Sequence, residues 1–228
     1  MQLNLKTIEN VGHDVYRIKL SADDTLNYAA GQYLLVNMSE DDQRPFSIAS
    51  SPSKDRFIEL HIGATPENPY AWDVIEQLRT KGSVQVSLAN GTAQLQPSEK
   101  DIILVAGGTG YSYVKSIAFE AATQGLENQI HIFWGAKQDS QLYEAALLQQ
   151  LADEHDNVHF HPVVEQPDTG WQGATGWVHH AVLQSFPDLS PFQVYIAGPF
   201  PMAKVARDDF YAAGLATDDL FGDAYAFI

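Results

Sequence analysis

Short runs of alternating apolar and polar residues fill the first half of the chain, and turn-forming residues separate them. Several short strands at this spacing are typical of an antiparallel barrel or sandwich. The runs cover residues 3–11, 14–20, 32–38, 44–50, 57–63 and 83–89. One of the turns between them is predicted at Asp23–Asp24.

One helix is predicted between the last two of these runs. Asn68 is a candidate N-cap, Pro69 suits the first helical position, and Gly82 marks the end. Ile75 and Leu78 fall on one face of this helix, together with Ala71. We expect this face to pack against the barrel.

The second half of the chain follows a different pattern, in which buried strands alternate with amphipathic helices. Strands are predicted at 102–106, 130–135, 158–164 and 193–198, and helices at 111–124, 141–155, 178–186 and 202–213. Four such alternations indicate a parallel sheet with helices on both faces. The end of the chain, 222–228, is predicted to be one more strand. We therefore expect two domains: an antiparallel β-barrel over 1–97 and an α/β domain over 98–228.

The charge of the chain argues against nucleic acid as a ligand. The formal net charge is −16 at pH 7, whereas binding to a phosphate backbone needs a basic face. Residues 1–96 hold 8 Lys/Arg and 12 Asp/Glu, and residues 97–228 hold 5 and 17, so most of the excess lies in the second half. An anionic nucleotide there would have to be attracted by local backbone N–H groups.

Cysteine is absent from the chain, which excludes disulfides, Cys-bound clusters and a catalytic thiol. Any redox chemistry must therefore come from a bound organic cofactor or substrate. No apolar run approaches the ~20 residues that span a membrane. The first residues also lack the pattern of a secretion signal. We expect a cytoplasmic protein without membrane association.

Two glycine-containing turns follow predicted strands of the α/β domain: Gly107, Gly108 and Gly110, and then Gly198 with Pro199. Glycines let the backbone approach a ligand, and the positive end of the following helix favours an anion. Both turns lie at the carboxyl ends of strands, where open α/β sheets bind nucleotides. Ordinary strand-to-helix turns without a ligand are the alternative.

The stretch RPFSIAS, 44–50, is unusual for a strand. Proline removes a ladder hydrogen bond and belongs at a strand start, an edge or a bulge. Here Pro45 directly follows Arg44, and Ser47 stands between apolar neighbours. A cation, a partly unpaired backbone and a small hydroxyl suggest a strand that faces a ligand. A strand-edge arginine with a satisfied core serine is the alternative.

These motifs, in the order RPFSIAS, GGTGYSY and AGPFPMAK before the aromatic end LFGDAYAFI, resemble the ferredoxin-NADP reductase superfamily. Within it, the chain is most similar to the NAD(P)H:flavin oxidoreductases of the Fre/LuxG type. The resemblance implies a flavin-binding barrel and a domain that binds NADPH or NADH. It also implies hydride transfer to free riboflavin, FMN or FAD, followed by release of the reduced flavin.

The resemblance also implies a flavin site around the RPFSIAS strand. Arg44 would contact the flavin side chain, while Pro45 and Phe46 shape the platform. Ser47 is the candidate catalytic residue. Hydride transfer puts negative charge on the reactive ring nitrogen of the flavin, and a hydroxyl that donates a hydrogen bond there would stabilise this charge. Further flavin-binding candidates are His61, Ile62, Asp223 and Tyr225.

In this family the nicotinamide ring stacks on the flavin, which brings the hydride close to its target. The implied nucleotide-binding residues are Gly107, Gly108, Thr109, Gly110, Trp134, Lys137, Gly198, Pro199 and Met202. Lys137 is a candidate contact for the adenosine ribose or its phosphate, and a solvated lysine is the alternative. No second basic residue accompanies it, so the choice between NADH and NADPH stays open.

Relatives that retain FAD carry a glycine–serine signature at the start of the helix that begins here with ENPYAWD. Pro69 has no N–H to offer a phosphate, and Glu67 and Asp73 would repel one. We therefore expect flavin to be an exchangeable substrate. The alternatives are an FAD-retaining reductase with a ferredoxin-like or oxygenase partner, and a non-catalytic nucleotide-binding subunit. A flavin-dependent monooxygenase or a luciferase is a candidate acceptor of the reduced flavin.

The histidines do not predict a metal site. His159 and His161 alternate on a predicted strand, and His179 and His180 are adjacent on a predicted helix. Neither pair has a convincing third ligand in the sequence.

Overall fold

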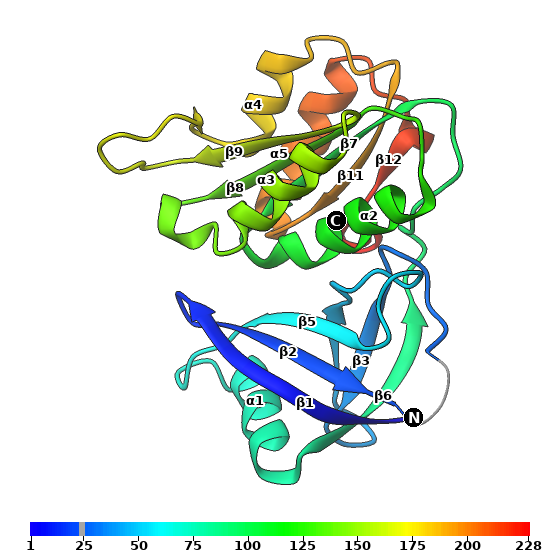
Figure 1. Cartoon of the computed structure of the whole chain (residues 1–228), viewed down its shortest axis with the longest axis vertical. Coiled ribbons are helices and arrows are strands. Elements are labelled where there is room, and N and C mark those ends of the chain that lie inside the picture. Colours follow the sequence, from blue (N-terminus) through cyan, green and yellow to red (C-terminus); the bar gives the residue numbers. More distant parts are fainter. Residues whose placement is uncertain (23–25) are drawn as a thin grey trace.

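The computed structural model describes residues 1–22 and 26–228, so the turn predicted at Asp23–Asp24 lies outside the described residues. Two domains are stacked on each other, and helix α2 (Tyr111–Gln124) runs along the boundary (Figure 1). The predicted boundary at residue 97 falls in the segment between β6 (Ser83–Asn90) and β7 (Asp101–Gly107). Within the described residues, no helix is long and apolar enough to cross a membrane.

The N-terminal domain is a six-stranded antiparallel barrel. Its strands are β1 (Gln2–Gly12), β2 (Val15–Ser21), β3 (Tyr33–Asn37), β4 (Gln43–Ser47), β5 (Ile58–Gly63) and β6, in the order β4-β3-β6-β1-β2-β5. Pro45 lies on the edge strand β4, where a missing N–H is tolerated. The strand ends at Ser47, earlier than predicted, because the chain then turns towards β5. There the Ala49 N–H donates to the Glu59 carbonyl at 2.8 Å and joins the two edge strands.

Helix α1 (Pro69–Lys81) packs against the barrel with the predicted face. Its buried residues are Ala71, Val74, Ile75 and Leu78. Gly82 ends the helix in the left-handed region, with φ of 69°, and its N–H donates to the Leu78 carbonyl. Asn68 occupies the N-cap position but makes no capping hydrogen bond through its side chain.

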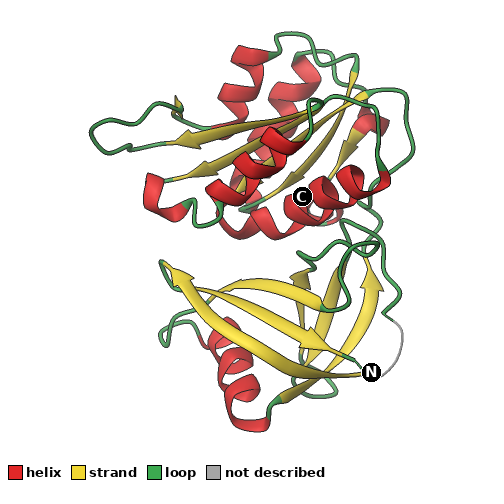
Figure 2. Cartoon of the chain, viewed as in Figure 1, coloured by secondary structure: helices red, strands yellow, loops and turns green. Residues whose placement is uncertain are grey.

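The C-terminal domain is a parallel sheet with two helices on each face (Figure 2). Its strands are β7, β8 (Ile130–Ala136), β9 (Val158–Val164), β10 (Ala174–Thr175), β11 (Phe192–Ala197) and β12 (Leu220–Phe221), in the order β10-β9-β8-β7-β11-β12. One face packs on α2 and α3 (Ala145–Glu154), the other on α4 (Val178–Ser185) and α5 (Phe200–Ala212). This two-sided burial explains the continuous apolar run of β7.

Two predicted elements of the C-terminal domain also differ from the structure. Helix α3 begins at Ala145 and not near 141, because the Gln141 side chain accepts the Lys137 and Gln138 N–H groups and caps a separate 3₁₀ turn. The end of the chain is not a strand beyond Phe221. Residues Asp223–Ala226 form a 3₁₀ turn that is anchored by the Tyr225 N–H donating to the Gly222 carbonyl at 3.1 Å.

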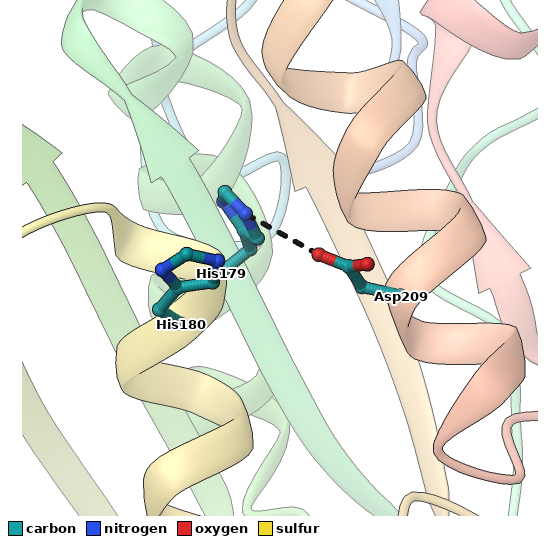
Figure 3. Close-up of side chains that lie close together, drawn as sticks. All are labelled: His179, His180 and Asp209. Atoms are coloured by element: carbon teal, nitrogen blue, oxygen red, sulfur yellow. Dashed lines mark ion pairs between the residues drawn. The ribbon is translucent and has the colours of Figure 1, made fainter.

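Tertiary packing gives each histidine pair a third neighbour, and for His179 and His180 this neighbour, Asp209, could act as a third metal ligand. His131 on β8 has its Nδ1 3.3 Å from the Nε2 of His161, and its ring stacks on that of His159. Next to the pair His179 and His180, the Asp209 Oδ2 on α5 lies 3.4 Å from the His179 Nε2 on α4 (Figure 3). Both partners come from separate segments, which is why local sequence did not reveal them.

Candidate active site

A cavity of about 560 Å³ lies between the two domains, and we call it the Ser47 cavity. The barrel contributes Pro45, Phe46, Ser47 and His61 to its wall. The α/β domain contributes Gly107, Gly108, Thr109, Gly110, Ser112, Tyr113, Ile196, Ala197, Gly198, Pro199, Phe200, Asp223 and Ala224. The structure thus brings the predicted serine and both glycine turns to one site.

A second cavity, of about 600 Å³, follows the carboxyl edge of the parallel sheet, and we call it the Lys137 cavity. Lys137, Met202, Gln141 and Glu165 line it, together with Trp177, Val178 and His179 at the start of α4. Gly107, Gly108, Thr109 and Pro199 line both cavities. Ligands in the two cavities would therefore meet at the glycine turn.

The glycines of the two turns serve two different purposes. A Cβ on Gly110 would lie 2.2 Å from the Ala197 carbonyl oxygen, and one on Gly107 would lie 2.5 Å from the Met202 Sδ. Gly110 therefore lets the two turns pack backbone to backbone, whereas Gly107 leaves room for the Met202 side chain. Gly108 differs, because it has φ of 55° and no heavy atom within 4 Å of an added Cβ. Its backbone therefore faces the space where a ligand can approach.

Trp134 supports the glycine turn from behind and does not line either cavity, although the sequence analysis assigned it to the nucleotide site. Its side chain is fully buried. Its Nε1–H donates to the Gly108 carbonyl at 3.0 Å, and its ring stacks on Tyr111 with 3.9 Å between centroids. Trp134 thereby holds the turn in position.

Arg44 also lies outside the walls of both cavities. Its Nε donates to both carboxylate oxygens of Asp42, at 2.9 and 3.1 Å, and its Nη1 donates to the Pro69 and Tyr70 carbonyls. Asp73 adds a second carboxylate 3.6 Å from Nη1. The guanidinium thus ties β4 to the start of α1, and its donors are taken by protein groups.

Two further residues predicted for the flavin site pack elsewhere. The Ile62 side chain belongs to the barrel core, and Tyr225 packs against the C-terminal core while its hydroxyl donates to the Ala203 carbonyl. Asp223, by contrast, lines the Ser47 cavity. Burial raises the pKa of its carboxyl to about 6, although a hydrogen bond from the Ala93 N–H partly offsets this.

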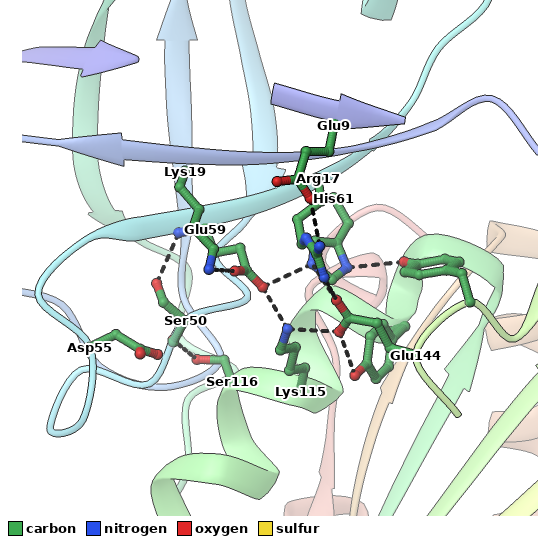
Figure 4. A network of polar contacts seen from close by, with 12 residues as sticks. Glu9, Arg17, Lys19, Ser50, Asp55, Glu59, His61, Lys115, Ser116 and Glu144 are labelled. Carbon is green, nitrogen blue, oxygen red and sulfur yellow. Dashed lines mark hydrogen bonds and ion pairs between the residues drawn. The ribbon is translucent and has the colours of Figure 1, made fainter. Parts of the chain in front are cut away.

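A buried ionic network next to the Ser47 cavity joins the two domains (Figure 4). His61 contacts the Glu59 carboxylate through Nε2 and the Tyr143 hydroxyl through Nδ1, each at 3.0 Å. Lys115 on α2 bridges Glu59 and Glu144, and Arg17 reaches Glu144 at 2.8 Å. Burial would raise the pKa of Glu59, but the His61 hydrogen bond and the Lys115 charge lower it to about 2. The network fixes one wall of the cavity.

Helix α2 makes a second set of polar contacts with the barrel. The Ser116 hydroxyl donates to the Ser50 carbonyl at 2.7 Å, and the Glu120 carboxylate accepts from the hydroxyls of Ser51 and Ser53. These interface residues were not predicted from the sequence. The available signal was the recurrence of polar residues 112, 116 and 120 at helical spacing.

Comparison with known proteins gives a consistent result for both domains. The FAD-binding domain family matches residues 1–86, and the oxidoreductase NAD-binding domain family matches residues 104–208. An NAD(P)H-flavin reductase of Vibrio harveyi is 43% identical over 235 residues, covering 100% of this chain and 99% of that protein. The chain belongs to the NAD(P)H-flavin reductase family. A second member, from Aliivibrio fischeri, is 42% identical, with 98% of each protein covered.

Solved structures show that the flavin reductase family shares its fold with more distant proteins. The ferredoxin reductase in carbazole 1,9a-dioxygenase has a TM-score of 0.83 and 23% identity, and the match covers 99% of this chain and 69% of that chain. The cytochrome b5 reductase domain of Ulva prolifera nitrate reductase has a TM-score of 0.79 and 19% identity, with 96% and 95% covered. These likenesses confirm the two-domain architecture of this flavin reductase family member.

Proposed function

We propose that this protein transfers a hydride from NADH or NADPH to free riboflavin, FMN or FAD and releases the reduced flavin. In this proposal the flavin occupies the Ser47 cavity, and the nicotinamide nucleotide occupies the Lys137 cavity. The reduced flavin then passes to a separate acceptor, such as a flavin-dependent monooxygenase or a luciferase.

The observation that carries this proposal is the shared wall of the two cavities. Gly107, Gly108, Thr109 and Pro199 border both, so ligands in the two cavities would approach each other at these residues. Proximity of donor and acceptor is the main requirement for hydride transfer. Ser47 stands at the end of β4 on the flavin side of this wall, where its hydroxyl can donate a hydrogen bond to a ring nitrogen.

Asp223 is proposed to hold the proton that the overall reaction consumes. The reaction converts NAD(P)H, a proton and oxidised flavin into NAD(P)⁺ and reduced flavin. The Asp223 carboxyl lines the Ser47 cavity, and its raised pKa of about 6 keeps part of the population protonated close to neutral pH.

The surroundings of Arg44 favour an exchangeable flavin over a retained FAD. The cation nearest to the start of α1 is neutralised by Asp42 and Asp73 and by backbone carbonyls. Pro69 offers no N–H at the helix start. A flavin phosphate or pyrophosphate would therefore have to displace existing ion pairs, whereas riboflavin would not.

The choice between the two nicotinamide nucleotides rests on Lys137 in this proposal. Lys137 and the Glu165 carboxylate line the same cavity with opposite charges. Lys137→Ala should raise KM for NADPH more than KM for NADH, because only NADPH carries a 2′-phosphate that gains from the cation. Equal increases in both constants would assign Lys137 to a group that the two nucleotides share, and unchanged constants would remove it from the nucleotide site.

A visible spectrum of the purified protein and a turnover assay test the proposed function. We expect a colourless protein that oxidises NAD(P)H only after riboflavin is added. A yellow protein that keeps its flavin through dialysis, and turns over only with a protein acceptor, would replace the proposal with an FAD-retaining reductase. Nucleotide binding without any turnover would indicate a non-catalytic subunit.

A further inference from the structure

Two helices on one face of the C-terminal sheet bring together side chains that suit a metal ion. His179 and His180 lie in the first turn of α4, and Asp209 lies on α5 (Figure 3). One ligating atom of each residue lies within 4.8 Å of those of the other two. The closest approach is 3.4 Å, between the His179 Nε2 and the Asp209 Oδ2. Two ligands of a tetrahedral Zn²⁺, each about 2.0–2.1 Å from the ion, are separated by nearly the same distance.

His179 is the member of this cluster that most needs a partner. It is 3% exposed, and within the described residues neither of its ring nitrogens has a hydrogen-bond partner. Buried polar groups are normally satisfied. His180 is exposed, so its ring is free to turn towards a bound ion.

The buried cluster of Glu59, His61 and Glu144 provides a contrast within the same chain. It has similar residue types at similar spacing, but Lys115 and Arg17 supply the positive charge, and both nitrogens of His61 have partners. That cluster is complete as an ionic network. Within the part of the chain that the structure describes, the only ion-pair contact of Asp209 is with His179.

We propose that His179, His180 and Asp209 bind a divalent transition-metal ion of the Zn²⁺ type. Two imidazoles and one carboxylate are donors that Zn²⁺ accepts, and imidazole nitrogens disfavour Mg²⁺ and Ca²⁺. Three protein ligands leave a fourth position for water or another small ligand. Zn²⁺ undergoes no redox change, so the bound ion would not itself accept electrons from the nicotinamide nucleotide. His179 lines the Lys137 cavity, so the ion lies at the edge of that cavity.

The test is isothermal titration of zinc chloride into metal-free protein that carries no polyhistidine tag. We expect one saturable site in the wild type. His180→Gln and Asp209→Asn should each raise Kd by about 10-fold or more, since loss of a direct ligand costs at least as much as loss of an outer-shell contact. Neither His180 nor Asp209 lines the Ser47 cavity or the Lys137 cavity, so NAD(P)H oxidation in metal-free buffer should stay unchanged and report intact folding.

Asp208→Asn is the matched control for charge. Asp208 lies next to Asp209 on α5, but its side chain is 63% exposed and pairs with Arg207. This variant removes the same charge from the same helix and should keep the Kd of the wild type. Absence of a saturable site in the wild type would overturn the proposal. So would an equal loss of affinity in all three variants, because that would indicate general attraction of cations to a chain of net charge −16.

Discussion

Replacing Gly110 with alanine should damage the active site through backbone packing. A Cβ at this position would lie 2.2 Å from the Ala197 carbonyl oxygen and 2.8 Å from the Gly198 nitrogen. Non-bonded heavy atoms in contact are about 3.5 Å apart, so the two turns must separate by about 1 Å. Ala197 pairs in register with Ala106 of β7, so the central sheet resists this movement.

The structure sets the expected size of this effect. Overpacking of this kind costs about 1–3 kcal/mol in the free energy of unfolding. A misplacement of about 1 Å between positioning groups reduces turnover by up to about 100-fold. That factor corresponds to about 2.7 kcal/mol in activation free energy. Gly110→Ala should therefore lower both the stability and the kcat/KM for NAD(P)H with riboflavin as acceptor.

Gly125 at the other end of α2 supplies the control. It has φ of 68°, and an added Cβ would meet no heavy atom within 4 Å. Gly125→Ala should cost about 1 kcal/mol of stability through backbone strain and leave the kinetics unchanged. Urea unfolding gives the stabilities, and initial rates give kcat/KM. The reasoning is refuted if Gly110→Ala loses stability yet keeps the kinetic constants of Gly125→Ala, because the turns would then not position the nucleotide.

Three further predictions concern single side chains. Ser47→Ala should lower kcat for riboflavin about 10- to 100-fold and change KM less, because a hydrogen bond to developing charge is worth about 1.5–3 kcal/mol; mild and equal changes in steady-state kinetics would contradict this role. With the Asp223 pKa at about 6, kcat should fall as the pH rises through that value, and Asp223→Asn should flatten this limb of the pH profile; an unaltered profile would argue against a proton donor here. Burial, and then the charges of His159 and His161, lower the pKa of His131 to about 4. Unfolded His131 takes up its proton near pH 6.5, so the free energy of unfolding should fall by roughly 1–3 kcal/mol as the pH falls from there towards 4. His131→Phe should remove this pH-dependent loss, as measured by urea unfolding at several pH values. The same dependence of stability on pH in the wild type and the variant would disprove this.

Local patterns predicted the elements that carry the site. The RPFSIAS run was predicted to be a strand whose proline belongs at a start, an edge or a bulge, and Pro45 lies on the edge strand β4. The glycine spacing predicted both turns at the carboxyl ends of strands, and Gly107–Gly110 and Gly198 line the Ser47 cavity. These predictions succeed because the residues involved restrict the backbone where they stand: proline removes a donor, and glycine permits a close approach.

Side-chain direction was less predictable than element type. Arg44 and Ser47 lie on the same strand, but successive side chains of a strand point to opposite faces. The Arg44 side chain therefore contacts Asp42 and the start of α1 and does not reach the cavity. Trp134 lies at the same sheet edge as Lys137, yet it is buried behind the glycine turn. A motif places a residue on an element, whereas the packing of that element decides which side chain reaches a ligand.

The sequence alone predicted the two domains and the order of their main strands and helices, because these depend on periodicity and on residues that constrain their own backbone. The family followed from the resemblance of its motifs to those of known reductases. Only the tertiary structure revealed how the domains are joined and which distant groups meet. Lys115 lies between Glu59 and Glu144, and Asp209 lies against His179, over separations of 56, 29 and 30 residues. Such contacts depend on how whole elements dock, and docking is governed by burial summed over many apolar side chains. No short stretch of the chain contains that information.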